Sequence, residues 1–139
     1  MRARKQIVDK PLISIVDDDA SVRRSTGRLI GSLGFEAETF ASAEDFLSSG
    51  RAAQTACLLL DVRMPGMGGL ELQRRLADHT PPIPIVFLTA RASEEEERRA
   101  LEAGAVGFLR KPVGKEQLLR MLSTIFDRSA RGQGDPHDD

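Results

Sequence analysis

Short apolar runs, most of them leading into polar or charged residues, constrain the fold of this chain most strongly. They are rich in Ile, Val and Leu and do not alternate with polar residues, which is typical of strands buried on both faces of a parallel sheet. The four clearest runs are Leu12–Val16, Cys57–Leu60, Ile85–Leu88 and Val106–Leu109. Together with a further strand near residues 35–40, they predict five strands separated by stretches with helical spacing.

The intervening stretches predict five helices. Glycines are expected to end several of them. We expect the fourth helix, Ser93–Ala103, to bury little because most of it is charged. Five strand–helix units joined by right-handed crossovers predict an α/β fold: a flavodoxin-like (βα)5 doubly wound sandwich with a parallel five-stranded sheet in the order 2-1-3-4-5.

Length and charge limit the class of protein. The 139 residues favour one domain, and 20 basic against 21 acidic residues lack the basic excess of a nucleic-acid binder. No apolar run approaches the ~20 residues of a membrane span, and Asp9 and Lys10 interrupt any signal-peptide core. We therefore expect a cytoplasmic protein with an extension over 1–10, a domain over 11–128, and a disordered tail or truncated linker over 129–139.

Residues far apart in the sequence follow the ends of the predicted strands. Ligands of open α/β sheets bind outside the carboxyl ends of the strands, so these side chains should meet in one pocket. They are Asp17, Asp18, Asp61, Thr89 and Lys111. Clustered carboxylates raise one another's pKa values unless a cation compensates, and Mg²⁺ accepts a few carboxylates while keeping several waters. The pattern therefore indicates a site for a divalent metal and a phosphoryl group.

Asp61 is the candidate nucleophile of this pocket, although taken alone it could simply cap a loop. A carboxylate with an ordinary pKa of ~3.9 is ionised at pH 7 and needs no general base. Mg²⁺ and Lys111 would offset its repulsion of an anionic phosphoryl group, and the Thr89 hydroxyl could donate to a phosphoryl oxygen. The peptide before Pro112 is trans by default, but a lysine pointing back into a cleft could favour cis.

Four sequence pieces in this order resemble the receiver domain of bacterial two-component response regulators. They are Val16–Asp19, Leu60–Leu70, Thr89–Ala90 and Lys111–Pro112. The resemblance covers about residues 12–127, whether the chain is a stand-alone regulator or was cut before an output domain. It implies a phosphorelay phosphoprotein that takes its phosphoryl group from a histidine kinase or phosphotransfer protein.

The resemblance also implies roles for individual residues. Asp61 would be the phosphoacceptor, and Thr89 and Lys111 would hold phosphoryl oxygens. Asp18, Asp61 and the backbone carbonyl of Arg63 would bind Mg²⁺, or Mn²⁺ as a substitute, with Asp17 holding the metal through water. Asp19 would start a helix and bind no metal.

Further positions follow from the same resemblance. Ala90 would keep the phosphoryl site open, the Lys111–Pro112 bond would be cis, and Phe108 would be the switch aromatic, although it could be plain core. Gly68 stands where the family often has a better helix cap, so a slightly softer helix start is expected.

Phosphorylation would change the charge at Asp61 from −1 to about −2. We hypothesise that Thr89 moves toward the new group and Phe108 rotates inward, so that the helix over 93–103 shifts. The face formed by this helix, the fifth strand and the last helix would then contact a protein target or a second copy in a homodimer. We expect no direct contact with nucleic acid or membrane.

Three other functions compete with this interpretation. An aspartyl phosphatase usually has a second acid two residues beyond the nucleophile, where this chain has Arg63. A flavin or nucleotide module of the same fold would have a glycine-rich loop after the first strand, where acids stand instead. A degenerate receiver would lack part of the acid set. We therefore expect an autocatalytic phosphoacceptor that acts on no other substrate.

Overall fold

The computed structural model describes residues 10–134, with side chains up to residue 127. It contains one parallel five-stranded sheet in the order β2-β1-β3-β4-β5, as predicted. The strands are β1 (Leu12–Val16), β2 (Glu36–Phe40), β3 (Thr55–Asp61), β4 (Ile85–Thr89) and β5 (Gly107–Arg110). The helices are α2 (Ala20–Ser32), α3 (Ala43–Ser49), α4 (Gly69–Arg75), α5 (Glu94–Glu102) and α6 (Lys115–Gly134), with a short 3₁₀ turn at Arg51–Gln54.

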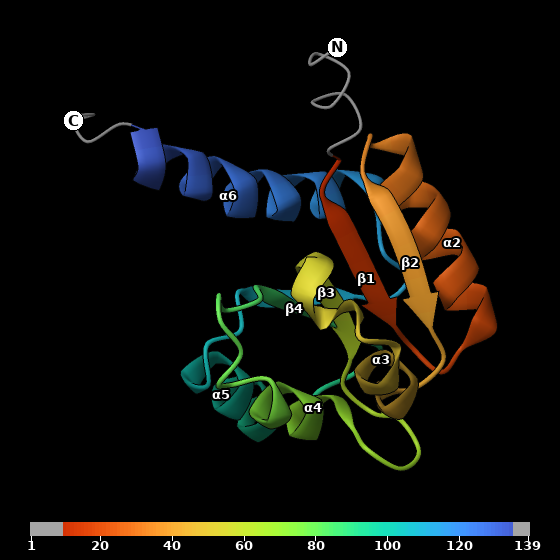
Figure 1. The fold of residues 1–139 in the computed structure, drawn as a ribbon. Coiled ribbons are helices and arrows are strands. Elements are labelled where there is room, and N and C mark those ends of the chain that lie inside the picture. The colour runs from red at the N-terminus through yellow and green to blue at the C-terminus, as the bar shows by residue number, and fades with distance from the viewer. Residues whose placement is uncertain (1–9, 135–139) are drawn as a thin grey trace.

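Helices cover both faces of the sheet (Figure 1). Successive strand residues point to opposite faces, and each face builds its own apolar cluster. Leu58, Leu60 and Phe87 face the cluster that includes Phe46 of α3 and Leu72 of α4. The neighbouring residues of the same strands face the other cluster, which lies under α2 and α6: Cys57, Leu59, Val86 and Leu88. This two-sided burial explains why β1, β3 and β4 have no polar alternation, whereas β2 at the edge of the sheet carries Glu36 and Glu38.

Local capping signals position the helix starts. The Asp19 carboxylate accepts hydrogen bonds from the amides of Ser21 and Val22, which confirms Asp19 as the residue that starts α2. Ser42 caps α3 in the same way, whereas Gly68 gives α4 no side-chain cap. The first turn of α4 must therefore be held by other contacts.

The last helix is longer than the sequence predicts. α6 continues to Gly134, six residues beyond the expected domain end at residue 128. Extending an existing helix costs far less than nucleating one, so the backbone can continue past the last buried turn at Ile125. Residues 135–139 of the expected tail, and residues 1–9 of the expected extension, lie outside the described residues. Among the helices in the described range, none is long and apolar enough to cross a membrane.

Candidate phosphoryl and metal site

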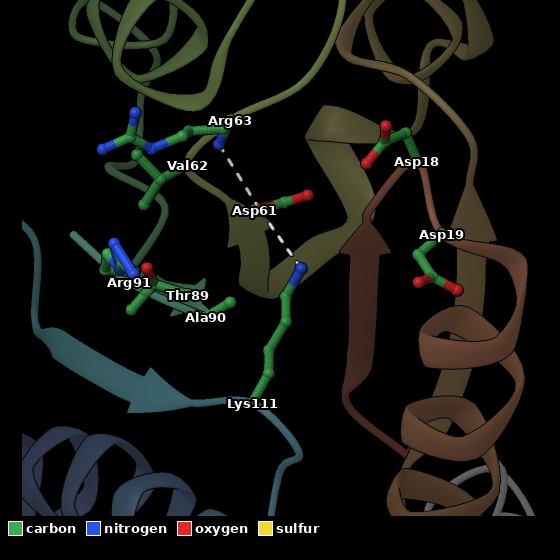
Figure 2. A pocket seen from close by; sticks show the side chains of 9 residues that line it. All are labelled: Asp18, Asp19, Asp61, Val62, Arg63, Thr89, Ala90, Arg91 and Lys111. Atoms are coloured by element: carbon green, nitrogen blue, oxygen red, sulfur yellow. Dashed lines mark hydrogen bonds and ion pairs between the residues drawn. The ribbon is translucent and has the colours of Figure 1, made fainter.

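The predicted residues converge at the carboxyl edge of the sheet. β1 and β4 both pair with β3, so Asp61, at the end of β3, lies between the residues that follow β1 and those that end β4. A pocket of about 730 Å³ opens at this edge (Figure 2). Its lining residues are Asp18, Asp19, Asp61, Val62, Arg63, Thr89, Ala90, Arg91 and Lys111.

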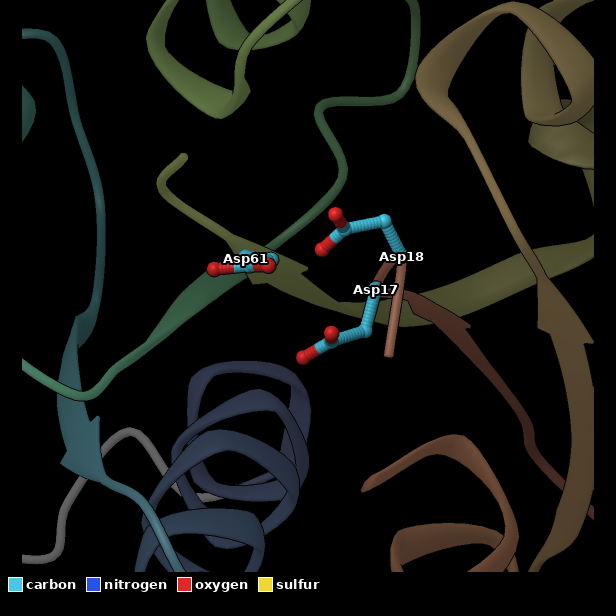
Figure 3. A group of neighbouring side chains, drawn as sticks. All are labelled: Asp17, Asp18 and Asp61. Carbon is cyan, nitrogen blue, oxygen red and sulfur yellow. The ribbon is translucent and has the colours of Figure 1, made fainter. Parts of the chain in front are cut away.

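Three carboxylates face one another at the rim of β1 and β3 (Figure 3). One oxygen from each of Asp17, Asp18 and Asp61 lies within 4.8 Å of the others. Asp17 and Asp61 are buried, whereas Asp18 is exposed and lines the pocket. Carboxylate oxygens at this spacing suit a hard divalent cation that keeps part of its water shell, so the donor set fits Mg²⁺.

Lys111 supplies the cation nearest to these acids. Its ammonium nitrogen lies 2.8 Å from Oδ2 of Asp17 and 3.3 Å from Oδ1 of Asp61. Figure 2 shows the lysine side chain reaching Asp61 from the end of β5. The peptide bonds before Pro81 and Pro112 are both cis, and the second is the bond expected to be cis.

Backbone contacts fix the acids in place. The Asp19 amide donates to Oδ1 of Asp17 at 2.9 Å, and the Arg63 amide approaches Oδ1 of Asp61 at 3.4 Å. The Arg23 guanidinium donates to the Asp17 carbonyl at 2.8 Å, which ties α2 to the end of β1. The two buried carboxylates are therefore anchored before any ligand binds.

Burial and the adjacent Asp17 carboxylate raise the pKa of Asp61 from its ordinary 3.8 to about 6, although Lys111 and the Arg63 amide act to lower it. Burial lowers the pKa of Lys111, but the charges and hydrogen bonds of Asp17 and Asp61 outweigh it and leave that pKa raised. At pH 7 the lysine is thus charged and Asp61 is mostly ionised. One lysine faces two buried carboxylates, so the site keeps an excess of negative charge that a divalent cation would neutralise.

Not every predicted residue lines the pocket. Thr89 is buried at its wall with Ala90 beside it, but Phe108 lies beneath, half-buried and stacked on Phe87 with ring centroids 5.5 Å apart. Its partners come from the apolar cluster under α3 and α4. Phe108 is therefore a neighbour of the site through the core and not a lining residue.

The sequence interpretation missed several residues at this edge. Gly69 starts α4 so close to β3 that a β-carbon there would collide with the Asp61 carbonyl, and its amide donates to the Val62 carbonyl at 2.9 Å. Arg91 lines the pocket two residues beyond Thr89. Glu96 of α5 does not line the pocket but pairs with Arg63, which does, at 2.6 Å. Only Glu96 had a local signal, because Ser93–Glu96 matches a helix capping box.

Comparison with known proteins identifies this architecture. Residues 13–123 match the family model described as the response regulator receiver domain. The chain belongs to this family, whose members act in two-component signalling. The fold and the cluster of Asp17, Asp18 and Asp61 thus agree with the family that the sequence motifs resemble.

Individual relatives agree with this assignment. Nodulation protein W of Bradyrhizobium diazoefficiens is 39% identical over 122 residues, which are 88% of this chain and 54% of that protein. Transcriptional regulatory protein TdiR of Thauera aromatica is 39% identical over 114 residues, 82% of this chain and 50% of that protein. The chain thus spans about half the length of these relatives. The solved structure of the response regulator StyR is 44% identical, with a TM-score of 0.75 over 91% of this chain and 67% of that one.

Proposed function

We propose that the chain is a Mg²⁺-dependent phosphoacceptor that takes a phosphoryl group from a phosphohistidine onto Asp61. A carboxylate oxygen of Asp61 forms the new bond to phosphorus, the phosphorus–nitrogen bond of the donor breaks, and the imidazole nitrogen keeps the electron pair and takes up a proton. The donor is a histidine kinase or phosphotransfer protein. The observation that carries this proposal is the clustering of Asp17, Asp18, Asp61 and Lys111 at the carboxyl edge of the sheet, where all but the buried Asp17 line the pocket.

The geometry supports a division of roles among the acids. Asp18 is exposed and lines the pocket, so with Asp61 and the Arg63 carbonyl it would bind Mg²⁺ directly. Asp17 is fully buried and paired with Lys111, which suits a ligand acting through water. When bound, Mg²⁺ supplies the positive charge that lets one anion approach another. Mn²⁺ is the substitute that the same oxygen ligands would accept.

Lys111 and Thr89 would hold phosphoryl oxygens. The lysine already lies between the two buried carboxylates, and its raised pKa keeps it charged throughout the physiological range. The Thr89 side chain belongs to the pocket wall, and Ala90 leaves space beside it. These residues position and neutralise the group but do not turn over an independent substrate, so the chain would be a switch and not an enzyme acting on other molecules.

The output of the switch would pass through Thr89 and Phe108 to the face formed by α5, β5 and α6. Phe108 is half-buried against Phe87, so its ring could be buried further if Thr89 moves toward the phosphoryl group and vacates space. Leu101 of α5 and Leu119 of α6 are 49% and 44% exposed, which suits contact with a protein target or a second copy. A beryllofluoride-bound structure in which Thr89 and Phe108 keep their positions would reject this route.

Other partners stay predictions. The prediction that nucleic acid is not contacted directly applies to the 139 residues of this chain only. Its relatives are about twice as long, and one of them is named a transcriptional regulatory protein. The cytoplasmic location is likewise a prediction.

The test of the proposed function is incubation with acetyl phosphate and Mg²⁺, followed by intact mass measurement. Wild type should gain one acid-stable, base-labile phosphoryl group, and Asp61→Asn should gain none. Equal gain by the two proteins would refute the assignment of Asp61. Hydrolysis of a generic phosphate ester by wild type, abolished in Asp61→Asn, would support the phosphatase alternative instead.

A further inference from the structure

Helix α5 is held to the rest of the domain by few apolar contacts. Ala100 is its only fully buried residue, and its first turn consists of four glutamates, Glu94–Glu97. A helix with so little buried surface depends on polar ties for its position. Two such ties reach neighbouring elements: Gln73 of α4 donates to the Ala100 carbonyl at 3.0 Å, and Arg63 pairs with Glu96 at 2.6 Å.

The same Glu96 side chain takes part in the capping box at the start of the helix. Oε1 of Glu96 accepts a hydrogen bond from the Ser93 amide at 3.0 Å, which completes the capping box, and the same oxygen accepts from Nη2 of Arg63. The ion pair therefore connects the first turn of α5 to the loop that follows Asp61.

Arg63 also belongs to the proposed phosphoryl site. Its amide approaches the Asp61 carboxylate, and it lines the pocket. Figure 2 shows its side chain directed away from Asp61, and the side chain is 61% exposed, so little packing would oppose a turn of the guanidinium once its pair with Glu96 breaks. A guanidinium binds phosphoryl oxygens as readily as it binds a carboxylate. It also keeps its positive charge at all relevant pH values.

We propose that Glu96 and an anion on Asp61 compete for the guanidinium of Arg63. The unmodified protein keeps the Arg63–Glu96 pair and the first turn of α5 is tied to the β3–α4 loop. A phosphoryl group on Asp61 draws Arg63 toward the pocket, so this tie is released while the Gln73 tie remains. The pair thereby couples occupancy of the site to the position of α5, and this inference rests on the proposed function.

The competition is tested by a double-mutant cycle on the affinity for beryllofluoride, a phosphoryl mimic, in the presence of Mg²⁺. Glu96→Gln removes the charge but keeps a capping-box acceptor, because Gln also serves at this position. Arg63→Ala removes the guanidinium and leaves the backbone carbonyl. Glu95→Gln is the matched control, since Glu95 pairs with Arg98 and Arg99 within α5.

We expect Glu96→Gln to bind beryllofluoride about two- to fivefold more tightly than wild type, the range that an exposed ion pair provides. The gain should vanish when Arg63→Ala is also present, and Glu95→Gln should match wild type. Equal affinities of Glu96→Gln and Glu95→Gln, or the same gain without Arg63, would overturn the competition and leave the phosphoacceptor intact. No binding by wild type would instead refute the phosphoacceptor, and the competition with it.

Discussion

The ammonium nitrogen of Lys111 lies 3.3 Å from Oδ1 of Asp61, at the end of a side chain that is only 16% exposed. The same nitrogen lies 2.8 Å from the buried Asp17 carboxylate. One cation thus serves two anions that have little access to water. Stability, metal binding and phosphoryl acceptance are therefore linked through the same few charges.

Lys111→Met should destabilise the metal-free protein by about 1–3 kcal/mol, because it leaves two buried carboxylates without their cation. Urea unfolding at pH 7 in EDTA measures the decrease in the free energy of unfolding. Lys115→Met at the exposed start of α6 is the matched control and should change the free energy of unfolding by less than about 0.5 kcal/mol. Equal effects of the two substitutions would show that Lys111 does not neutralise the acids.

Mg²⁺ should stabilise the wild-type protein, since it binds the folded acidic cluster and not the unfolded chain. At a hundredfold excess over its Kd the gain is about 2.7 kcal/mol. Asp18→Asn should lose most of this gain at the same concentration, whereas Asp78→Asn, an exposed acid outside the site, should keep it. Thermal unfolding with and without Mg²⁺ provides the measurement, and an unchanged gain in Asp18→Asn would remove Asp18 from the ligand set.

The pH dependence of stability should report Asp61. Its pKa is raised from 3.8 to about 6 in the folded protein, so the native state binds more protons than the unfolded state within this window. Stability of the metal-free protein therefore falls as pH rises through the window. One pKa unit corresponds to about 1.4 kcal/mol, so ionised Asp61 costs up to about 3 kcal/mol above pH 6.

Asp61→Asn removes this cost, and its advantage over wild type should grow between pH 4 and pH 7. Comparing the two proteins by urea unfolding in EDTA cancels the titration of the shared groups that do not interact with Asp61, and leaves that of Asp61 with its partners Asp17 and Lys111. An advantage that stays constant over this range would contradict the raised pKa.

Gly69→Ala should destabilise the protein by about 1–3 kcal/mol despite the better helix propensity of alanine. The new methyl group would collide with the Asp61 carbonyl and lie 3.0 Å from Cε1 of Phe87. Gly68→Ala is the neighbouring control, because its β-carbon would lie 3.3 Å from the Val62 carbonyl. Chemical unfolding of both variants checks the prediction, and equal stability of the two would show that α4 can shift away from β3.

Much of the fold could be predicted from the sequence because both faces of the sheet are covered. Buried parallel strands such as β3 need continuous apolar runs, and polar residues that follow such runs mark the strand ends. The 3₁₀ turn at Arg51–Gln54 and the full length of α6 had no such signal. Their boundaries depend on local backbone hydrogen bonds and on helix propagation, which hydrophobic spacing does not encode.

The site was predictable to the extent that it follows strand ends. Asp61, Thr89 and Lys111 each end or follow a strand, and parallel topology brings them together. Gly69 and Arg63 act through close packing and a long side chain, and neither property is visible in the sequence. The pairing of Arg63 with Glu96 joins residues 33 positions apart and depends on how α5 packs.

The position of the phosphoryl group tests the central claim most directly. The protein is incubated with acetyl phosphate and Mg²⁺, reduced with borohydride, which converts an aspartyl phosphate to homoserine, and mapped by peptide mass spectrometry. We predict homoserine at position 61 and none at positions 17 or 18. Homoserine at either of those acids, or an unmodified residue 61 in protein that has gained a phosphoryl group, would contradict the account.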